Sequence, residues 1–215
     1  TLGMFLDAMD FYDIQNGMVI GDPIDGKIFL AKTFDSGDSW NQIDTKSYPT
    51  LLNGEACFAS SGSNIVMLNK RKFAYVTGGV ASNLYIGKKK VKLPIIQGKE
   101  STGANSLAVK NSRTWMVVGG DFLQKEEQIE HAVVTTNAGK SFLKPIEPPH
   151  GYRSCVKFLN VKTWITCGLN GVDITTDDGL HWQKISSEGF HVCQKARNGN
   201  VVYFAGQGKI GVYRE

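Results

Sequence analysis

Apolar residues follow two short patterns along the chain, and both predict β-strands. Apolar and polar residues alternate in ANSLAVK at 104–110 and KIGVYRE at 209–215, which predicts strands with one buried face. Short apolar runs that end in glycine, such as KFAYVTGG at 72–79 and TWMVVGG at 114–120, predict strands buried on both faces. All of these runs are shorter than a membrane-spanning helix. The pattern therefore predicts an all-β domain, and we expect no membrane insertion.

Three stretches between predicted strands share the pattern [ST]-x-[DN]-x-G-x-x-[WF]: TFDSGDSW at 33–40, TTNAGKSF at 135–142 and TTDDGLHW at 175–182. An Asp or Asn at the third position accepts hydrogen bonds from backbone N–H groups of its own turn. The glycine supplies a positive φ, and the aromatic residue covers the hairpin. We therefore assign a structural role to these repeated turns, whose key residues are Asp35, Gly37, Trp40, Asn137, Gly139, Phe142, Asp177, Gly179 and Trp182.

The spacing of the repeated turns predicts a β-propeller. Asp35 and Asn137 are 102 residues apart, and Asn137 and Asp177 are 40 apart, which fits repeats of propeller-blade length. A blade is a four-stranded antiparallel sheet, and blades pack radially around a channel. We divide this single domain, 1–215, into about five blade units at 4–50, 51–100, 101–148, 149–188 and 189–215. The fifth unit lacks its outermost strand.

In a closed ring, a strand from the other end of the chain often completes the last blade and leaves no open edge. The segment 1–3 is too short for this role. We therefore expect further N-terminal blades beyond this chain, in a ring of about seven, over an imperfectly closed ring of five.

The repeated turns resemble the Asp-box, or BNR repeat, of sialidases and many other propellers. Other stretches resemble the secreted BNR-repeat proteins of Bacteroidetes that are related to photosystem II stability/assembly factors. They are FLDAMDFYD, GDPIDGKIF, GEACFASSGSNI, GKESTGANS, PPHGYRSCV, TWITCGLNGVD and GFHVCQKARNGN. The resemblance implies a seven-bladed propeller with a signal peptide and about two more N-terminal blades. It also implies an extracytoplasmic (periplasmic, secreted or outer-membrane associated) location.

Composition and charge exclude several classes of function. The chain has 41% hydrophobic and 20% charged residues and a net charge of +4, which is typical of a soluble globular domain. Its basic clusters, NKRK at 69–72 and GKKKVKL at 87–93, lack interleaved aromatic residues, so we interpret them as strand edges and expect no nucleic-acid partner. The chain has no CxxC motif, no metal spacing of histidines and no glycine-rich dinucleotide turn, so we expect neither metal nor cofactor.

The four cysteines fall mainly at one repeated position. Alignment of the units places Ala8, Cys57, Ser106, Cys155 and Cys193 at equivalent places on the innermost strands. All are small, which favours packing where the channel narrows. Cys155 and Cys167 form an alternative, because they could pair across adjacent strands in an oxidising compartment.

The repeated turns connect third and fourth strands, so the turns between second and third strands and the connections between blades meet at the opposite end of the propeller. We call this end the mouth and expect ligand-binding residues there, because loops on a rigid scaffold carry function. The candidates are Asp7, Asp22, Asp25, Glu55, Lys99, Glu100, Asn105, Asp121, His150, Tyr152, Arg153, Asn170 and His191. For Asp22 and Asp25, in GDPIDG, a role as turn formers is an equal alternative.

Two functions follow from this set. The first is a non-enzymatic binding or scaffold propeller that holds a protein or glycan at the mouth. The alternative is a carbohydrate-active enzyme, a glycoside hydrolase or lyase, whose two carboxylates come from Glu55, Glu100, Asp22 and Asp121. The carboxylate arrangement distinguishes the two: a pair facing each other across an open pocket favours the enzyme, and buried or distant carboxylates favour the scaffold.

Overall fold

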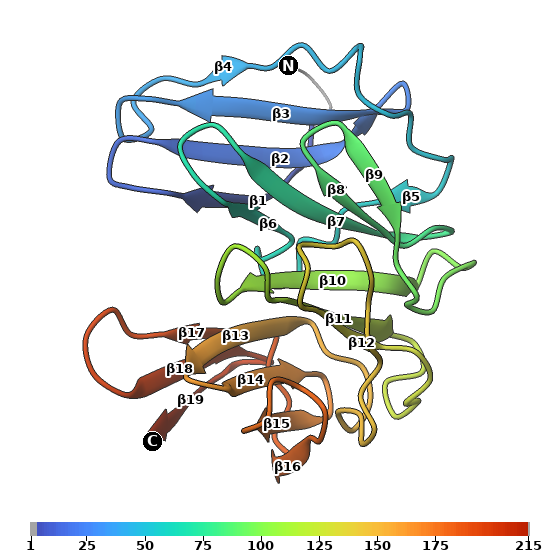
Figure 1. The fold of residues 1–215 in the computed structure, drawn as a ribbon, viewed down its shortest axis with the longest axis vertical. Coiled ribbons are helices and arrows are strands. Elements are labelled where there is room, and N and C mark those ends of the chain that lie inside the picture. Colours follow the sequence, from blue (N-terminus) through green and yellow to red (C-terminus); the bar gives the residue numbers. More distant parts are fainter. Residues whose placement is uncertain (1–3, 215) are drawn as a thin grey trace.

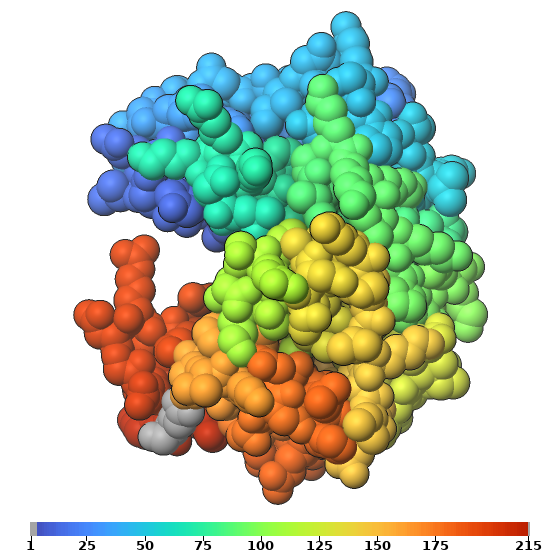
Figure 2. All heavy atoms as spheres, viewed as in Figure 1, coloured from blue at the N-terminus to red at the C-terminus, as the bar shows by residue number. Residues whose placement is uncertain are grey.

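A computed structural model of the protein describes residues 4–214, which form β-strands, turns and loops without a helix. The strands form five successive antiparallel blades arranged in an arc (Figure 1). The first and last blades face each other across an open side (Figure 2). The chain is thus a partial β-propeller, as the sequence predicted. Residues 1–3, judged too short for a closing strand, lie outside the described residues.

The strands of the first three blades have the following bounds. The first blade contains β1 (Leu6–Phe11), β2 (Gly17–Ile24), β3 (Lys27–Thr33) and β4 (Asn41–Gln42). The second contains β5 (Glu55–Ala56), β6 (Ile65–Met67), β7 (Phe73–Gly79), β8 (Asn83–Ile86) and β9 (Lys89–Lys92). The third contains β10 (Thr102–Val109), β11 (Trp115–Asp121) and β12 (Ala132–Thr135).

The last two blades complete the arc. The fourth contains β13 (Cys155–Asn160), β14 (Thr163–Gly168), β15 (Gly171–Thr175) and β16 (Gln183–Ser186). The fifth contains β17 (Val192–Lys195), β18 (Val201–Gly206) and β19 (Lys209–Arg214), and β19 is its outermost strand among the described residues.

Two blades depart from the simple four-stranded pattern. In the second, the innermost strand is broken into β5 and β6, which both pair with β7. In the third, the fourth strand is reduced to a bridge between Val134 and Leu143. A bridge between Gly103 and Gly78 joins these two blades into one eight-stranded sheet.

The hydrophobic core lies between neighbouring blades, and strand alternation explains how. Successive side chains of a strand point to opposite faces of its sheet. In β11, Trp115 and Val117 therefore pack toward the second blade, and Met116 and Val118 pack toward the fourth. A strand that contributes to both interfaces has no polar face, which is why the second strands are near-continuous apolar runs.

The three repeated turns form the same set of hydrogen bonds. In the turn that follows β15, Thr175 Oγ1 donates to Asp177 Oδ1 (2.7 Å) and accepts from the Gly179 N–H (3.2 Å), and Asp177 Oδ1 accepts from the His181 N–H (3.1 Å). The turns at 33–40 and 135–142 repeat these contacts. The residue before each glycine also has a positive φ, at Ser36, Ala138 and Asp178. Each turn therefore satisfies its own polar groups.

Asp177→Ala is expected to lower the free energy of unfolding by about 1–2 kcal/mol, because it leaves the turn's donors without their acceptor. Burial opposes ionisation of Asp177, but hydrogen bonds from His181, Thr175 and Leu180 hold its pKa at about 2. Its contribution to stability should therefore be lost as pH falls from about 4 to about 2.

The matched variant is Asp177→Asn, because Asn137 already holds the same bonds in the turn at 135–142. It should retain near-wild-type stability at pH 7 and lose the acid dependence. Urea unfolding at pH 7 and pH 3 measures both effects, and equal losses in the two variants would contradict this role.

Candidate functional site at the mouth

A main-chain contact repeated at the mouth positions the predicted site residues. In four blades, a glycine of the second strand lies against a backbone carbonyl of the innermost strand. That carbonyl belongs to the residue three positions before the small residue at the repeated position, which is Ala8, Cys57, Ser106 or Cys155. A Cβ on the glycine would lie 2.3, 2.0, 1.9 and 1.9 Å from the carbonyl oxygen in the pairs Gly21–Phe5, Gly79–Gly54, Gly119–Gly103 and Gly168–Tyr152. Only glycine allows this approach, so the contact fixes the backbone geometry of the mouth.

The innermost strand is irregular at this contact. The register shifts between Leu6 and Ala8 in β1 and between Ala104 and Ser106 in β10, as in a β-bulge. The unpaired residue of each shift, Asp7 or Asn105, comes directly before the small residue. A second position, two places before each small residue, lies next to it. This second position is occupied by Leu6, Glu55, Ala104, Arg153 and His191. Three of the ionisable residues predicted from sequence therefore occupy equivalent positions in three blades.

Glu55 points into its own blade and is saturated with hydrogen bonds. Its Oε1 accepts from Thr77 Oγ1 (2.7 Å), Asn83 Nδ2 (2.8 Å) and Tyr85 Oη (2.7 Å). Its Oε2 accepts from the Leu52 N–H (3.1 Å) and contacts Lys90 Nζ (3.2 Å), and the side chain is fully buried. Burial alone would raise the pKa of Glu55, but the hydrogen bonds hold it below its usual value.

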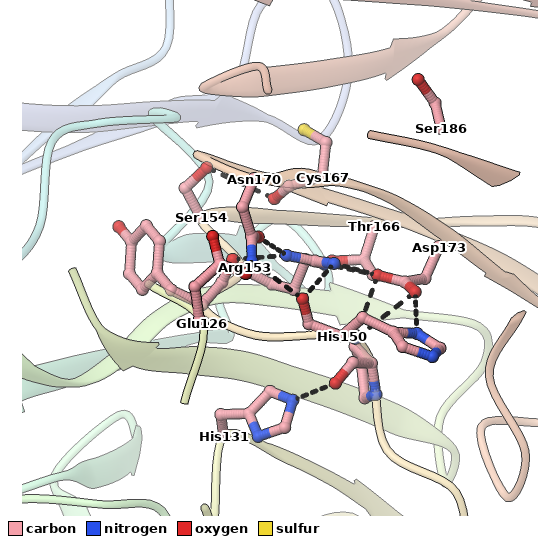
Figure 3. Close-up of polar contacts among 12 residues, drawn as sticks. Glu126, His131, His150, Arg153, Ser154, Thr166, Cys167, Asn170, Asp173 and Ser186 are labelled. Carbon is pink, nitrogen blue, oxygen red and sulfur yellow. Dashed lines mark hydrogen bonds and ion pairs between the residues drawn. The ribbon is translucent and has the colours of Figure 1, made fainter. Parts of the chain in front are cut away.

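Arg153 occupies the same position in the fourth blade with the opposite charge. Figure 3 shows its contacts with Asp173, Asn170 and His150. Its guanidinium donates from Nε to Asp173 Oδ2 (2.6 Å) and also pairs with that carboxylate through Nη2. Nη1 donates to Asn170 Oδ1 (2.6 Å), and Arg153 and Asp173 are both fully buried. The pair is therefore a neutral unit inside the blade.

His150 is the exposed end of the Arg153 network. Its Nδ1 lies 2.7 Å from Asp173 Oδ1, and its side chain is 41% exposed. Because a carboxylate only accepts, Nδ1 carries the hydrogen and Nε2 remains available. His150 lines a groove of about 590 Å³ along the edge of the fourth blade, together with Glu147, Asp177, His181 and Lys184.

The loop between β11 and β12 packs against this network. Asn170 Nδ2 donates to Glu126 Oε2 (2.7 Å), and the Tyr152 N–H donates to the Lys125 carbonyl (2.9 Å). The loop covers residues 122–131. Most of its side chains are exposed, but its backbone is bonded to the residue directly before Arg153.

Asp7 and Asp22 form a second, unneutralised acidic group at the mouth. Asp7 Oδ2 and Asp22 Oδ1 are buried, and each lacks a hydrogen-bond partner within residues 4–214. Burial, followed by the charge of Asp22, raises the pKa of Asp7 to about 7. Burial also raises the pKa of Asp22, against the effect of a hydrogen bond from the Cys57 N–H.

The remaining predicted residues divide between the interior and the rim. Asn105 and Tyr152 are buried and joined by a Tyr152 Oη–Asn105 Oδ1 bond of 2.7 Å. Asp121 is buried 3.9 Å from the exposed ammonium of Lys99. Asp25 is an exposed turn residue with φ of 51°, and Glu100 is exposed while His191 is partly buried.

Asn170 and His150 were among the predicted site residues, but the other side-chain partners of Glu55 and Arg153 were not predicted from sequence. The clearest available signal was Asp173, a carboxylate within GVDIT in a strand whose other positions are apolar or small. A charge in such a strand requires a nearby partner of opposite charge. Thr77, Asn83 and Tyr85 gave no comparable signal, because hydroxyl and amide groups are ordinary in strands.

The mouth offers little for the chemistry of a glycoside hydrolase. Of the four candidate carboxylates, Glu55 and Asp121 are buried, Asp22 lies beside Asp7, and Glu100 is on the exposed rim. Within residues 4–214, no group of three or more His, Cys, Asp or Glu side chains is arranged to hold a metal ion. The same residues include no helix long and apolar enough to cross a membrane.

No protein-family model and no curated protein sequence matches the chain. Solved structures with a similar fold include YCF48 from Cyanidioschyzon merolae, at 12% identity and a TM-score of 0.52, with 98% of this chain and 67% of that chain covered. An ancestral GH74 enzyme is similar at 16% identity and a TM-score of 0.58, over 93% of this chain and 27% of that one.

PorZ, a surface component of the type-IX secretion system of Porphyromonas gingivalis, is similar at 10% identity and a TM-score of 0.50, over 98% of this chain and 27% of that one. The chain spans about a quarter of the GH74 enzyme and of PorZ. At these identities the comparisons establish a shared fold, and that fold is the β-propeller.

Proposed function

We propose that this chain is a non-enzymatic binding propeller that holds a protein segment at its mouth, outside the cytoplasm. The supporting observation is the division of charge at the mouth. Glu55 and Arg153 are neutralised within their own blades, whereas Lys99, Glu100, Glu126 and His150 remain on the rim. Buried Glu55 and Arg153 with satisfied polar groups, together with a rim of exposed charges, suit recognition of a polar ligand.

The same division argues against hydrolysis as the main activity. A glycosidase needs an acid and a base or nucleophile that both reach the substrate. The Glu55 carboxylate accepts from five donors within the protein, and its side chain has no exposed surface from which it could reach a substrate. A binding role makes use of the rim without requiring a free carboxylate pair.

Binding to peptide and glycan arrays, followed by calorimetry on the best ligand, tests the proposal. His150→Ala and Lys99→Ala should each weaken binding of a peptide ligand by about tenfold, which corresponds to about 1.4 kcal/mol. Lys162→Ala, an exposed lysine in the turn between β13 and β14 at the opposite end, should leave affinity unchanged.

Three results would contradict the proposal. Equal affinity in the wild type and both rim variants would remove the mouth as the binding surface. Stronger binding of glycans than of peptides on the arrays would show that the ligand is a glycan and not a protein segment. Cleavage of an array glycan, abolished by Asp22→Asn, would establish the hydrolase instead.

A further inference from the structure

Three of the four cysteines meet inside the fourth and fifth blades. Cys155 of β13, Cys167 of β14 and Cys193 of β17 are all fully buried. Cys155 lies directly opposite Cys167 in the antiparallel register, and its thiol donates to the Cys193 carbonyl (3.4 Å). Hydrogen bonds also join the Cys155 thiol to those of Cys167 and Cys193.

The fold does not require sulfur at this place. Ala8 and Ser106 occupy the position of Cys155 in the first and third blades, and both are buried. Cys57 occupies it in the second blade, where its charged neighbours are Asp7, Asp22 and Glu55. Cys57 is therefore an internal control, a fully buried thiol at the same position with carboxylates around it.

We propose that Cys155 and Cys167 form a disulfide bond when this protein folds under oxidising conditions, and that Cys193 remains a thiol. Opposed residues in antiparallel strands have Cα atoms about 4.5–5.5 Å apart, and their side chains share one face. A disulfide requires Cα atoms about 4.4–6.8 Å apart. The pair therefore fits a cross-strand bridge without backbone movement.

Chain connectivity favours Cys167 over Cys193 as the partner. Cys155 and Cys167 belong to one hairpin, β13–β14, closed by a short turn at 161–162. Cys193 is 38 residues from Cys155 and reaches it only when the fifth blade docks. Short loops close before distant segments meet, so the hairpin pair meets an oxidant first, while the thiols are still accessible.

The reaction is an exchange with a low-molecular-weight disulfide such as oxidised glutathione. The Cys155 thiolate attacks one sulfur of that disulfide, which forms a mixed disulfide and releases one thiolate. The Cys167 thiolate then attacks the Cys155 sulfur, which closes the protein bond and releases the second thiolate. Two protein thiols are oxidised, one external disulfide is reduced, and the two protein protons pass to the released thiolates.

The local environment favours Cys155 as the first nucleophile. The hydrogen bond from the Cys167 thiol, which lies in the same hairpin, is the largest cause that lowers the pKa of Cys155. Burial raises the pKa of Cys167, and the bond with Cys155 adds to that effect. The proposal rests on the proposed extracytoplasmic location only for where the oxidant is met, so a test on purified protein is independent of the binding function.

The test is to refold the full chain with oxidised and reduced glutathione, denature it in acid, alkylate the free thiols and map the peptides by mass spectrometry. Two of the four cysteines should be alkylated, Cys57 and Cys193, and a linked peptide should join Cys155 to Cys167. The oxidised form should melt about 5–10 °C above the reduced form.

Variants and alternative links make the test decisive. Cys57→Ala and Cys193→Ala should retain the linked peptide, and Cys155→Ala should lose it. Alkylation of all four wild-type cysteines would overturn the proposal. A link from Cys193 to Cys155 or Cys167 would overturn the assignment of the pair. The wild-type map is sufficient if Cys155→Ala fails to fold.

Discussion

Replacing Arg153 with methionine is expected to lower the free energy of unfolding by about 3–5 kcal/mol. The variant removes the guanidinium that pairs with Asp173 and donates to Asn170, so a fully buried carboxylate loses its counter-charge. Removal of one partner of a buried ion pair lowers the stability by more than the intact pair contributes to it, because the remaining charge is buried without a counter-charge. Urea unfolding at pH 7 measures the loss.

Two further variants test this explanation. Arg153→Met combined with Asp173→Asn should recover part of the loss, because no charge is left buried. Arg113→Met should change stability by less than about 0.5 kcal/mol, because Arg113 is exposed. A double variant no more stable than Arg153→Met alone would show that packing, and not the stranded charge, determines the effect.

Asp7→Asn is expected to stabilise the protein at pH 8, by up to about 4 kcal/mol if the whole pKa shift is recovered. Asp7 is 94% buried beside Asp22, and its pKa is raised from 3.8 to about 7. A raised folded-state pKa contributes stability at low pH that is lost as pH rises through about 7. The wild type should therefore weaken between about pH 4 and pH 7, and Asp7→Asn should flatten this slope.

Unfolding of both proteins at pH 5 and pH 8 measures the difference. The control is Asp25→Asn, which removes a carboxylate from the exposed turn between β2 and β3 of the same blade and should leave the slope unchanged. If Asp7→Asn destabilises the protein equally at both pH values, then the Asp7 side chain is needed as a hydrogen-bond acceptor in the native state. Its charge would then not explain the pH dependence of stability.

The fold was predictable because its signals are local. Each repeated turn contains its own donors, acceptor and glycine within eight residues, so one stretch of sequence specifies one structure. The second strands can also be recognised from a short stretch of sequence, because both faces of each strand are buried and must be apolar. The break between β5 and β6 and the reduced fourth strand of the third blade were not predicted, because pairing partners there are distant in sequence.

The predicted site was only partly located by the same reasoning. Glu55, Arg153 and His191 were selected because they come just before the small residues of the innermost strands and are not turn formers. The structure places Glu55 and Arg153 inside their blades, where both bond to partners on the third strand. Their burial depends on Asn83, Tyr85 and Asp173, and no local sequence pattern links those residues to Glu55 and Arg153.

The glycine–carbonyl contact at the mouth has an implication for protein engineering. Main-chain atoms alone set this geometry in four blades, so the side chain beside it is free to differ. Leucine, glutamate, alanine and arginine already occupy that position in these four blades. A designer could therefore exchange its occupant together with the matching third-strand residue, and so reprogram one sector of the propeller while the others stay as they are.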